Sequence, residues 1–241
     1  MSDITTWPPA YVLIKHPRAR HVKLKTSIRH GLELVVPKRF NQKDIPEILE
    51  ANKAWIIKHL AKLREQTDNY LNAPLPDEIV LAAGDLRWKM TYLETESKKL
   101  RVMTRPFQEL VLFGNTQDKK LVKKILVTWV KQQAKLFLSA RLQQLSDTYG
   151  LSFTSITIRN QKSRWGSCTS QKAINLNYKL IFLPAELADH IILHELCHTI
   201  HMNHSTSFWR LVAKFDPDWK IHSKETRRAE KFIPPWVGET G

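Results

Sequence analysis

The chain has 241 residues, of which 42% are hydrophobic, and this composition is typical of a globular protein with an ample core. No apolar run is long enough to span a membrane, and Met1 to Ala10 lacks the basic start and apolar core of a signal peptide. We therefore expect a cytoplasmic protein with no membrane partner. The net charge of +15 divides as +6, +5 and +4 over residues 1–75, 76–150 and 151–241. This even spread indicates no basic tail or single recognition helix, but it leaves nucleic acid open as a partner.

The N-terminal part is predicted to contain strands followed by one helix. Alternation of apolar and polar residues predicts strands at 11–14, 22–25 and 32–36, which we expect to form a small antiparallel unit. Asp44 and Glu47 have the spacing of a capping box, so a helix is predicted to begin there and to continue to about Gln66.

A breaker-rich connection at 69–77 leads to a second β region. Four strands are predicted at 78–83, 86–93, 100–104 and 109–113, and their punctuation by Gly and Pro is typical of a meander. The interpretation of this region is structural, as a β layer or a substrate-shaping extension.

A long helix is predicted from about Gln117 to Tyr149, and Gly150 is a natural stop. Its apolar stripe consists of Leu121, Ile125, Trp129, Ala134, Leu136, Leu138, Leu142 and Leu145. Lys119, Lys120, Lys123 and Lys124 are predicted to be exposed to solvent.

The next segments follow the order strand, polar loop, strand and helix. Strands are predicted at 152–159 and 173–177, with the loop 164–168 between them, and Pro184 opens the helix. In this order a strand can lie beside the helix, and such a strand can bind an extended peptide through its backbone.

The helix that Pro184 opens carries the motif His194-Glu195-Leu196-Cys197-His198. Residues four apart lie on one face of a helix, so His194 and His198 can place two imidazole nitrogens on one ion. Glu195 lies one step around the helix, close to the metal without binding it. That is the position of a general base that takes a proton from a zinc-activated water.

Two histidines are candidates for the third ligand. On a straight helix His201 lies about 10 Å along the axis from His194, which is too far for one ion with bonds of about 2 Å. His204 can bind only if the helix breaks and the chain folds back, and Asn203 is the predicted break because Asn tolerates the left-handed conformation. An unbroken helix would require a downstream ligand such as Glu225.

Several segments together resemble the YgjP-like metallopeptidase family, related to zincins of the M48 type and to SprT-like proteases. They are Arg164-Trp-Gly-Ser-Cys168, Asn175-Leu-Asn177, the motif at 194–198, Asn203-His204-Ser205 and Phe208-Trp209. The resemblance covers about 15–235, although its specific motifs lie within 160–210. It implies a zinc metallopeptidase with His194, His198 and His204 as ligands to one Zn²⁺ and Glu195 as the catalytic base.

We therefore predict an α+β fold with two parts. Residues 1–115 form a β-rich N-terminal extension with one helix, and residues 116–241 form a zincin-like core of an antiparallel sheet and an active-site helix. The predicted substrate is a peptide or protein. Alternative functions are a structural-zinc nucleic-acid-binding protein and a protease recruited to DNA.

Candidates for contacts with the substrate or the oxyanion are Arg164, Asn175, Asn177, Tyr178 and His201. An arginine can bind a carboxylate or stabilise an oxyanion, and Tyr178 or His201 can polarise a carbonyl. We expect Cys168 and Cys197 to pack, since a thiolate ligand would close the metal position that catalysis needs.

Overall fold

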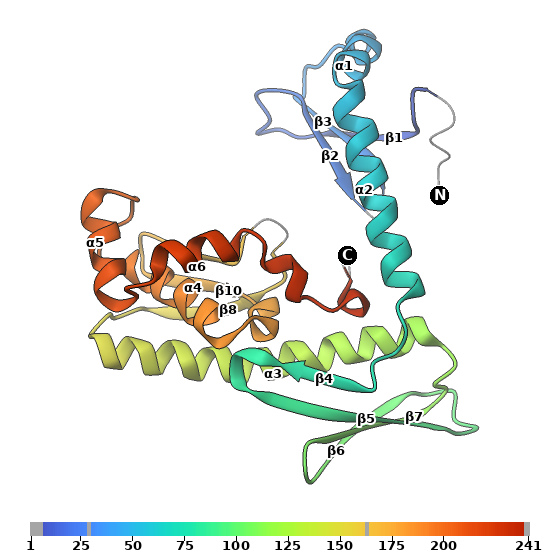
Figure 1. Ribbon diagram of the computed structural model, residues 1–241. Helices are drawn as coiled ribbons and strands as arrows, with labels where there is room; N and C mark the ends of the chain where they lie inside the picture. Colours follow the sequence, from blue (N-terminus) through green and yellow to red (C-terminus); the bar gives the residue numbers. More distant parts are fainter. Residues whose placement is uncertain (1–6, 28–29, 162–163, 239–241) are drawn as a thin grey trace. The chain divides into compact units, whose positions relative to one another are not determined.

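The computed structural model describes residues 7–27, 30–161 and 164–238 and contains two compact units (Figure 1). Unit 1 is Met1–Pro74 with Pro235–Gly241, and unit 2 is Leu75–Pro234. The sequence predicts a division at residue 115. In the structure the β region at 78–114 instead belongs to the same unit as the long helix that follows it.

Unit 1 is a three-stranded sheet covered on one face by helices. The strands β1 (Tyr11–Lys15), β2 (Lys23–Ser27) and β3 (Gly31–Val36) have the order β1-β3-β2. β2 and β3 are antiparallel, but β1 joins the other edge of β3 in parallel, so the prediction of an antiparallel unit is wrong for this pair. The core consists of Leu32, Leu34 and Val36 from β3 with Ile45, Leu49 and Ile56 from the helices.

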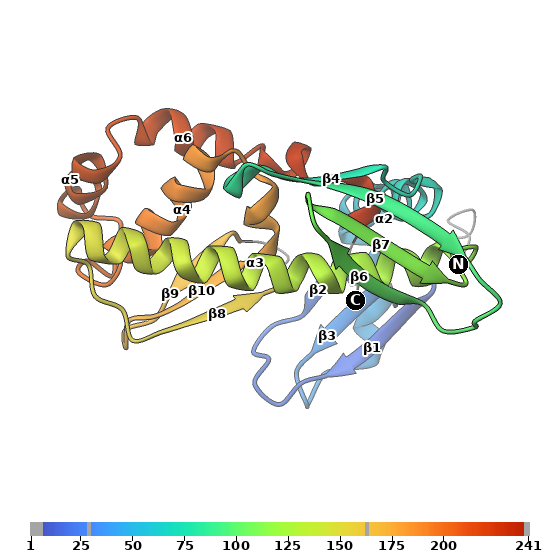
Figure 2. The same ribbon diagram turned by 90° about the horizontal axis from the view of Figure 1, so that it is seen from below.

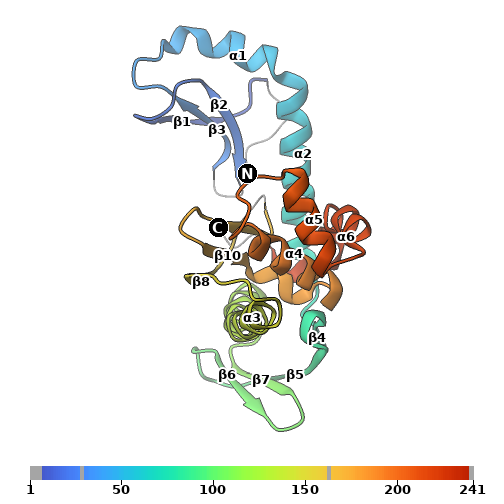
Figure 3. The same cartoon turned by 90° about the vertical axis from the view of Figure 1, so that its left-hand side faces the viewer.

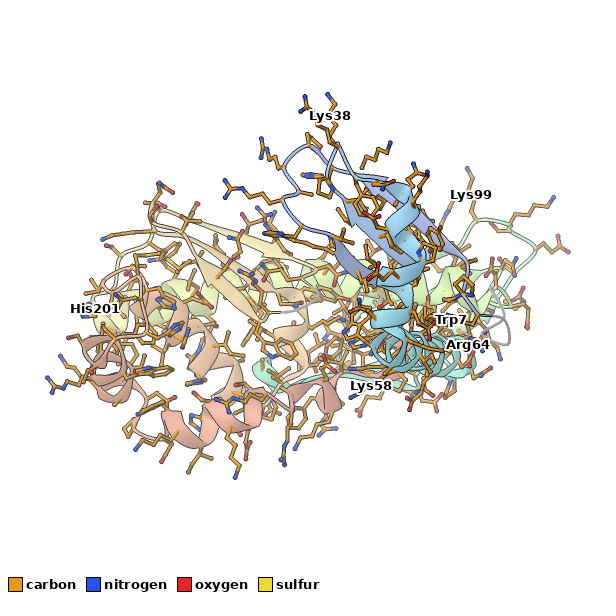
Figure 4. The ribbon with its side chains drawn as sticks, turned by 90° about the horizontal axis from the view of Figure 1, so that it is seen from above. Trp7, Lys38, Lys58, Arg64, Lys99 and His201 are labelled. Atoms are coloured by element: carbon orange, nitrogen blue, oxygen red, sulfur yellow. The ribbon has the colours of Figure 1, made fainter. Side chains whose placement is uncertain are left out.

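The predicted single helix of unit 1 is two helices, α1 (Ile45–Ala51) and α2 (Lys53–Asn72). Asn52 separates them, and its side-chain amide donates to the carbonyl of Ile48 at 2.8 Å. Asp44 makes no side-chain cap bond, so the predicted capping box is absent. Asn41 instead caps the short helix η1 (Gln42–Asp44). Figure 4 shows Lys38 and Lys58 projecting from this unit, and η5 (Pro235–Val237) packs against α2.

The first sheet of unit 2 contains β4 (Glu78–Leu81), β5 (Leu86–Glu94), β6 (Arg101–Arg105) and β7 (Glu109–Gly114), with η2 (Ala82–Gly84) after β4. Its order is β4-β5-β7-β6. The predicted meander is therefore wrong, because the β6–β7 hairpin places β7 beside β5 in parallel and leaves β6 at the edge.

The helix α3 (Lys119–Tyr149) is the longest element of unit 2 and has 31 residues. The carboxylate of Asp118 accepts a bond from the Leu121 amide at 2.9 Å, and Gly150 ends the helix in the left-handed conformation. Figures 1 and 3 show α3 between the β4–β7 sheet and a second sheet, and Trp88 of β5 meets Trp129 of α3 edge to face. Lys123 is buried, contrary to the prediction that it is exposed.

The second sheet of unit 2 lies along the C-terminal half of α3 (Figure 2). It contains β8 (Ser155–Arg159), β9 (Gly166–Cys168) and β10 (Ala173–Asn177) in the order β8-β10-β9. The predicted antiparallel sheet is in fact mixed, since β8 and β10 are parallel.

After β10 come η3 (Tyr178–Phe182), α4 (Ala185–Cys197), α5 (Thr206–Phe215), α6 (Trp219–Thr226) and η4 (Ala229–Phe232). α4 packs against α3, α5, α6 and β9, and the guanidinium of Arg141 on α3 makes two bonds to the carboxylate of Asp189 on α4, at 2.8 and 2.5 Å. The predicted α+β class is confirmed, with helices packed against small sheets. Within the ranges described, no helix is long and apolar enough to cross a bilayer.

The packing of α3 can be tested with two leucines that the sequence placed in the same stripe. Leu138 is fully buried, whereas Leu136 is 68% exposed. We expect Leu138→Ala to lower the free energy of unfolding by about 2–5 kcal/mol, because it leaves a cavity, and Leu136→Ala to change it by less than about 0.5 kcal/mol. Denaturant unfolding measures both, and equal losses would contradict the packing of this helix.

Candidate metal centre

Three histidines from the end of α4 and the loop after it converge in unit 2. His194 lies in the last turn of α4, His198 is its C-cap residue, and His204 immediately precedes the cap of α5. One nitrogen from each imidazole lies within 4.8 Å of the other two, and the Nε2 atoms of His194 and His204 are 3.1 Å apart. This cluster could hold a metal ion.

The chain folds back between His198 and His204, as a shared site requires. α4 ends at Cys197, and the amides of Thr199, Ile200 and His201 close turns onto the carbonyls of Leu196 and Cys197. The predicted break at Asn203 is therefore misplaced by several residues. Asn203 does not adopt a positive φ, and its side-chain oxygen accepts a bond from the Ser205 amide at 3.2 Å.

The tautomer of His198 suits metal binding. Its Nδ1 lies 2.9 Å from the carbonyl oxygen of His201, and a carbonyl can only accept, so Nδ1 carries the proton. The lone pair of Nε2 is then free to bind a metal, and a backbone carbonyl is a common orienting partner for a ligating histidine. His201 thus contributes its backbone, and Figure 4 shows its side chain in the loop that follows α4.

The distances and protonation of the cluster fit zinc. Zinc–nitrogen bonds of about 2.0–2.1 Å at tetrahedral angles separate two nitrogens by roughly 3.3 Å, close to the 3.1 Å between His194 and His204. Burial, together with the neighbouring imidazoles, lowers the pKa of His194 to about 3. This imidazole is therefore neutral at ordinary pH, as a ligand must be.

Aromatic side chains of α5 support the three imidazoles. Phe208 is fully buried, and its ring centroid lies 4.9, 4.4 and 4.9 Å from those of His194, His198 and His204. Trp209 stacks on His204, with 5.6 Å between centroids. The Oγ of Ser205 accepts a bond from the Phe208 amide, so the cap of α5 lies directly after the third histidine.

Glu195 lies beside the cluster against the backbone of β9. Glu195 is 6% exposed, and burial raises its pKa to about 8 against the opposing effect of the Arg164 charge. A Cβ on Gly166 would lie 2.6 Å from both Cγ and Oε1 of Glu195. Only glycine therefore allows β9 to approach this carboxylate so closely, which gives a physical role to the glycine of the Trp-Gly-Ser segment.

The remaining predicted contact residues fall into two groups. Arg164 is exposed, and its charge acts on Glu195, so it lies near the cluster. Asn175 is half-buried on β10, with its amide 3.4 Å from the Ser167 hydroxyl. Asn177 and Tyr178, by contrast, are buried.

Asn177 holds the loop that carries Arg164. Its amide donates to the carbonyls of Gln161 at 2.8 Å and Arg164 at 3.2 Å, and its oxygen accepts from the Lys179 amide. The hydroxyl of Tyr178 is inaccessible to solvent, so a substrate could not reach it in this arrangement. Both residues thus shape the structure around the site.

Both cysteines are free thiols, and neither belongs to the histidine cluster formed by the described residues. Burial raises the pKa of Cys168 to about 11, with Glu195 adding to the effect, and the pKa of Cys197 to about 12. A thiolate fourth ligand therefore receives no support from the geometry.

A second group of three residues, not found from the sequence, lies next to the cluster. His190, Asp216 and His222 come from α4, the end of α5 and α6, and their ligand atoms also lie within 4.8 Å of one another. His190 precedes His194 by four residues, a spacing visible in the sequence. Asp216 and His222 carried no local signal, because only tertiary packing brings them to α4.

The chain was compared with known proteins and structures. The model of the YgjP-like family, described as a metallopeptidase domain, matches residues 20–229. The crystal structure of the metallopeptidase zymogen of Pyrococcus abyssi abylysin is 28% identical, with a TM-score of 0.35, over 39% of this chain and 93% of that one. No curated protein matches the sequence significantly.

The contact between Gly166 and Glu195 yields a prediction. Gly166→Ala should lower the free energy of unfolding by about 1–3 kcal/mol, because the added methyl group overlaps a buried carboxylate. A crystal structure of the variant should show Glu195 displaced. Ser167→Ala on the same strand is the control and should cost less than about 1 kcal/mol. A variant of wild-type stability with Glu195 in place would refute the contact.

Proposed function

Since the chain belongs to the YgjP-like metallopeptidase family, we propose that it hydrolyses peptide bonds with one zinc ion held by His194, His198 and His204 and with Glu195 as general base. The observation that carries this proposal is the convergence of three imidazole nitrogens within 4.8 Å, next to a buried carboxylate that does not belong to the cluster. Three histidines would hold the ion and leave room on it for a water molecule, as a catalytic site requires.

The side chains divide the chemistry between them. Zinc, when bound, acts as a Lewis acid that polarises the scissile carbonyl and lowers the pKa of a water molecule. Glu195 accepts the proton of the attacking water and returns it to the amine of the leaving peptide. Arg164, exposed and within electrostatic reach of Glu195, is the proposed contact for the substrate carbonyl or a carboxylate.

The strand β9 is the proposed platform for the peptide. It lies at the edge of its sheet and, among the strands described, pairs only with β10. Its other edge can therefore pair with an extended substrate through backbone hydrogen bonds. Because Gly166 of β9 contacts Glu195, a peptide bound to this strand would pass close to the general base.

The three-histidine cluster argues against the alternative of a purely structural zinc site. Closed structural sites have four protein ligands and usually include cysteine. Here the cluster of described residues has three histidines, and the thiols of Cys168 and Cys197 lie outside it. The arrangement therefore supports catalysis more strongly than a structural role.

Replacing the general base should separate catalysis from metal binding. We expect Glu195→Gln to reduce peptidase activity by roughly 10²–10⁴-fold while the protein still binds one zinc per chain, because Gln cannot accept the proton. Activity is measured on a peptide library and zinc by elemental analysis. Glu186→Gln, at an exposed position in the first turn of the same helix, is the control and should retain activity. Full activity in the Glu195 variant would overturn the mechanism.

The third ligand can be tested by comparing two histidines of the same loop. His204→Ala should weaken zinc binding by more than the roughly 10–100-fold that is typical of losing a residue that only orients a ligand. His201→Ala should leave zinc affinity nearly unchanged, because only the backbone carbonyl of His201 contacts His198. Competition with a chromophoric chelator measures both affinities. The reverse order of effects would assign the third ligand to His201.

A further inference from the structure

The carboxylate of Asp216 is buried between two histidines from two other helices. It lies 2.6 Å from Nδ1 of His190 on α4, and its two oxygens lie 2.9 and 3.0 Å from Nδ1 of His222 on α6. The Oγ of Ser223 lies 3.1 Å from Nε2 of His190. Asp216 itself is the C-cap residue of α5, so this group, which we name the Asp216 clamp, joins three helices.

The donor distances decide between a metal site and a hydrogen-bonded group. Donors that share a zinc ion are roughly 3.3 Å apart, a value that the Nε2 atoms of His194 and His204 approach at 3.1 Å. The 2.6 Å between His190 and Asp216 is well short of it and is typical of a charge-assisted hydrogen bond. The clamp is therefore two imidazole N–H groups donating to one carboxylate, with the Ser223 hydroxyl donating to His190.

The clamp fixes the end of α5 opposite to the end that contacts the metal centre. Phe208 and Trp209, in the first turn of α5, pack on the three metal-site histidines. Asp216 holds the last turn of α5 to α4 one helical turn before His194, and the rings of His190 and His194 are 6.3 Å apart. The corner after Asp216 places Trp219 at the start of α6, where it stacks on Trp209 with 4.4 Å between centroids.

We propose that Asp216 is a positioning residue of the metal centre, which holds α5 against α4 so that Phe208 and Trp209 keep His204 in binding position. His204 needs such support because, unlike His194 and His198, it is exposed and lies on a loop. This inference rests on the proposed metal site. Asn at position 216 keeps one acceptor oxygen but presents an amide N–H to an imidazole N–H, so one of the two anchors is lost.

The test is the zinc dissociation constant of the full-length protein, measured by chelator competition at a temperature where circular dichroism shows every variant folded. Asp216→Asn should weaken zinc binding by roughly 10–100-fold, the range seen when groups that orient ligands are removed. Asp218→Asn is the matched control, two residues away and exposed, and should bind zinc like the wild type.

A second pair of variants keeps the test informative if Asp216→Asn folds poorly. His222→Asn retains an N–H near the position of Nδ1 and should bind zinc within about threefold of the wild type, whereas His222→Leu removes the donor and should show the full loss. Wild-type affinity in Asp216→Asn or His222→Leu would overturn the proposal. So would a second zinc equivalent in the wild type that disappears in Asp216→Asn, which would make the clamp a metal site.

The zinc-free protein separates this proposal from the proposed function. If the wild type binds no zinc, or binds it independently of His204, the proposed function fails. The clamp is then judged by the near-ultraviolet circular dichroism of the stacked Trp209–Trp219 pair. A changed signal in Asp216→Asn but not in Asp218→Asn would support the clamp's hold on α5, and an unchanged signal would overturn it.

Discussion

The packing of Phe208 among three imidazoles is the contact on which the geometry of the candidate metal centre depends. His194 and His198 lie on one face of α4 by helical geometry alone, but His204 follows a turn and has no such constraint. Phe208 is fully buried and meets all three rings, so it fills the space behind the cluster and fixes the third histidine relative to the other two. The loop after α4 thereby acquires the precision that a shared ion demands, because rings held by packing have few alternative rotamers.

On its other side, α4 is in close contact with β9. β9 approaches the Glu195 carboxylate at a distance that only Gly166 permits, and the loop before it is tied to β10 through Asn177. The indole N–H of Trp165 donates to the carbonyl of Thr226 at the end of α6. β9 and Glu195 are therefore held together on this side of α4, and the loop before β9 is tied to both β10 and α6.

The limits of sequence reasoning follow from how local each interaction is. The helical face shared by His194 and His198 and the stop at Gly150 depend on neighbours along the chain, and the patterns predicted them. The parallel pairing of β5 with β7 depends on which edge a hairpin joins, which no periodicity records. His204 could be proposed only on condition that the chain reversed, and the reversal occurs earlier than Asn203. Asp216 carries no such local signal, because its histidine partners lie 26 and 6 residues away on separate helices.

The buried carboxylate of Asp216 explains how the position of α5 next to the candidate metal centre is fixed. An ionised carboxylate removed from water is destabilising unless hydrogen bonds compensate it, and Asp216 is compensated only where α4 and α6 both deliver an N–H. That requirement admits few relative positions of the three helices, whereas non-directional apolar packing, as of the buried Val212, tolerates small shifts. The directional bonds at one end of α5 therefore select its position, and the aromatic contacts at the other end convert that position into the placement of His204. The Asp216 end of α5 therefore determines where the helix lies, and the Phe208–Trp209 end contributes most of the favourable apolar burial.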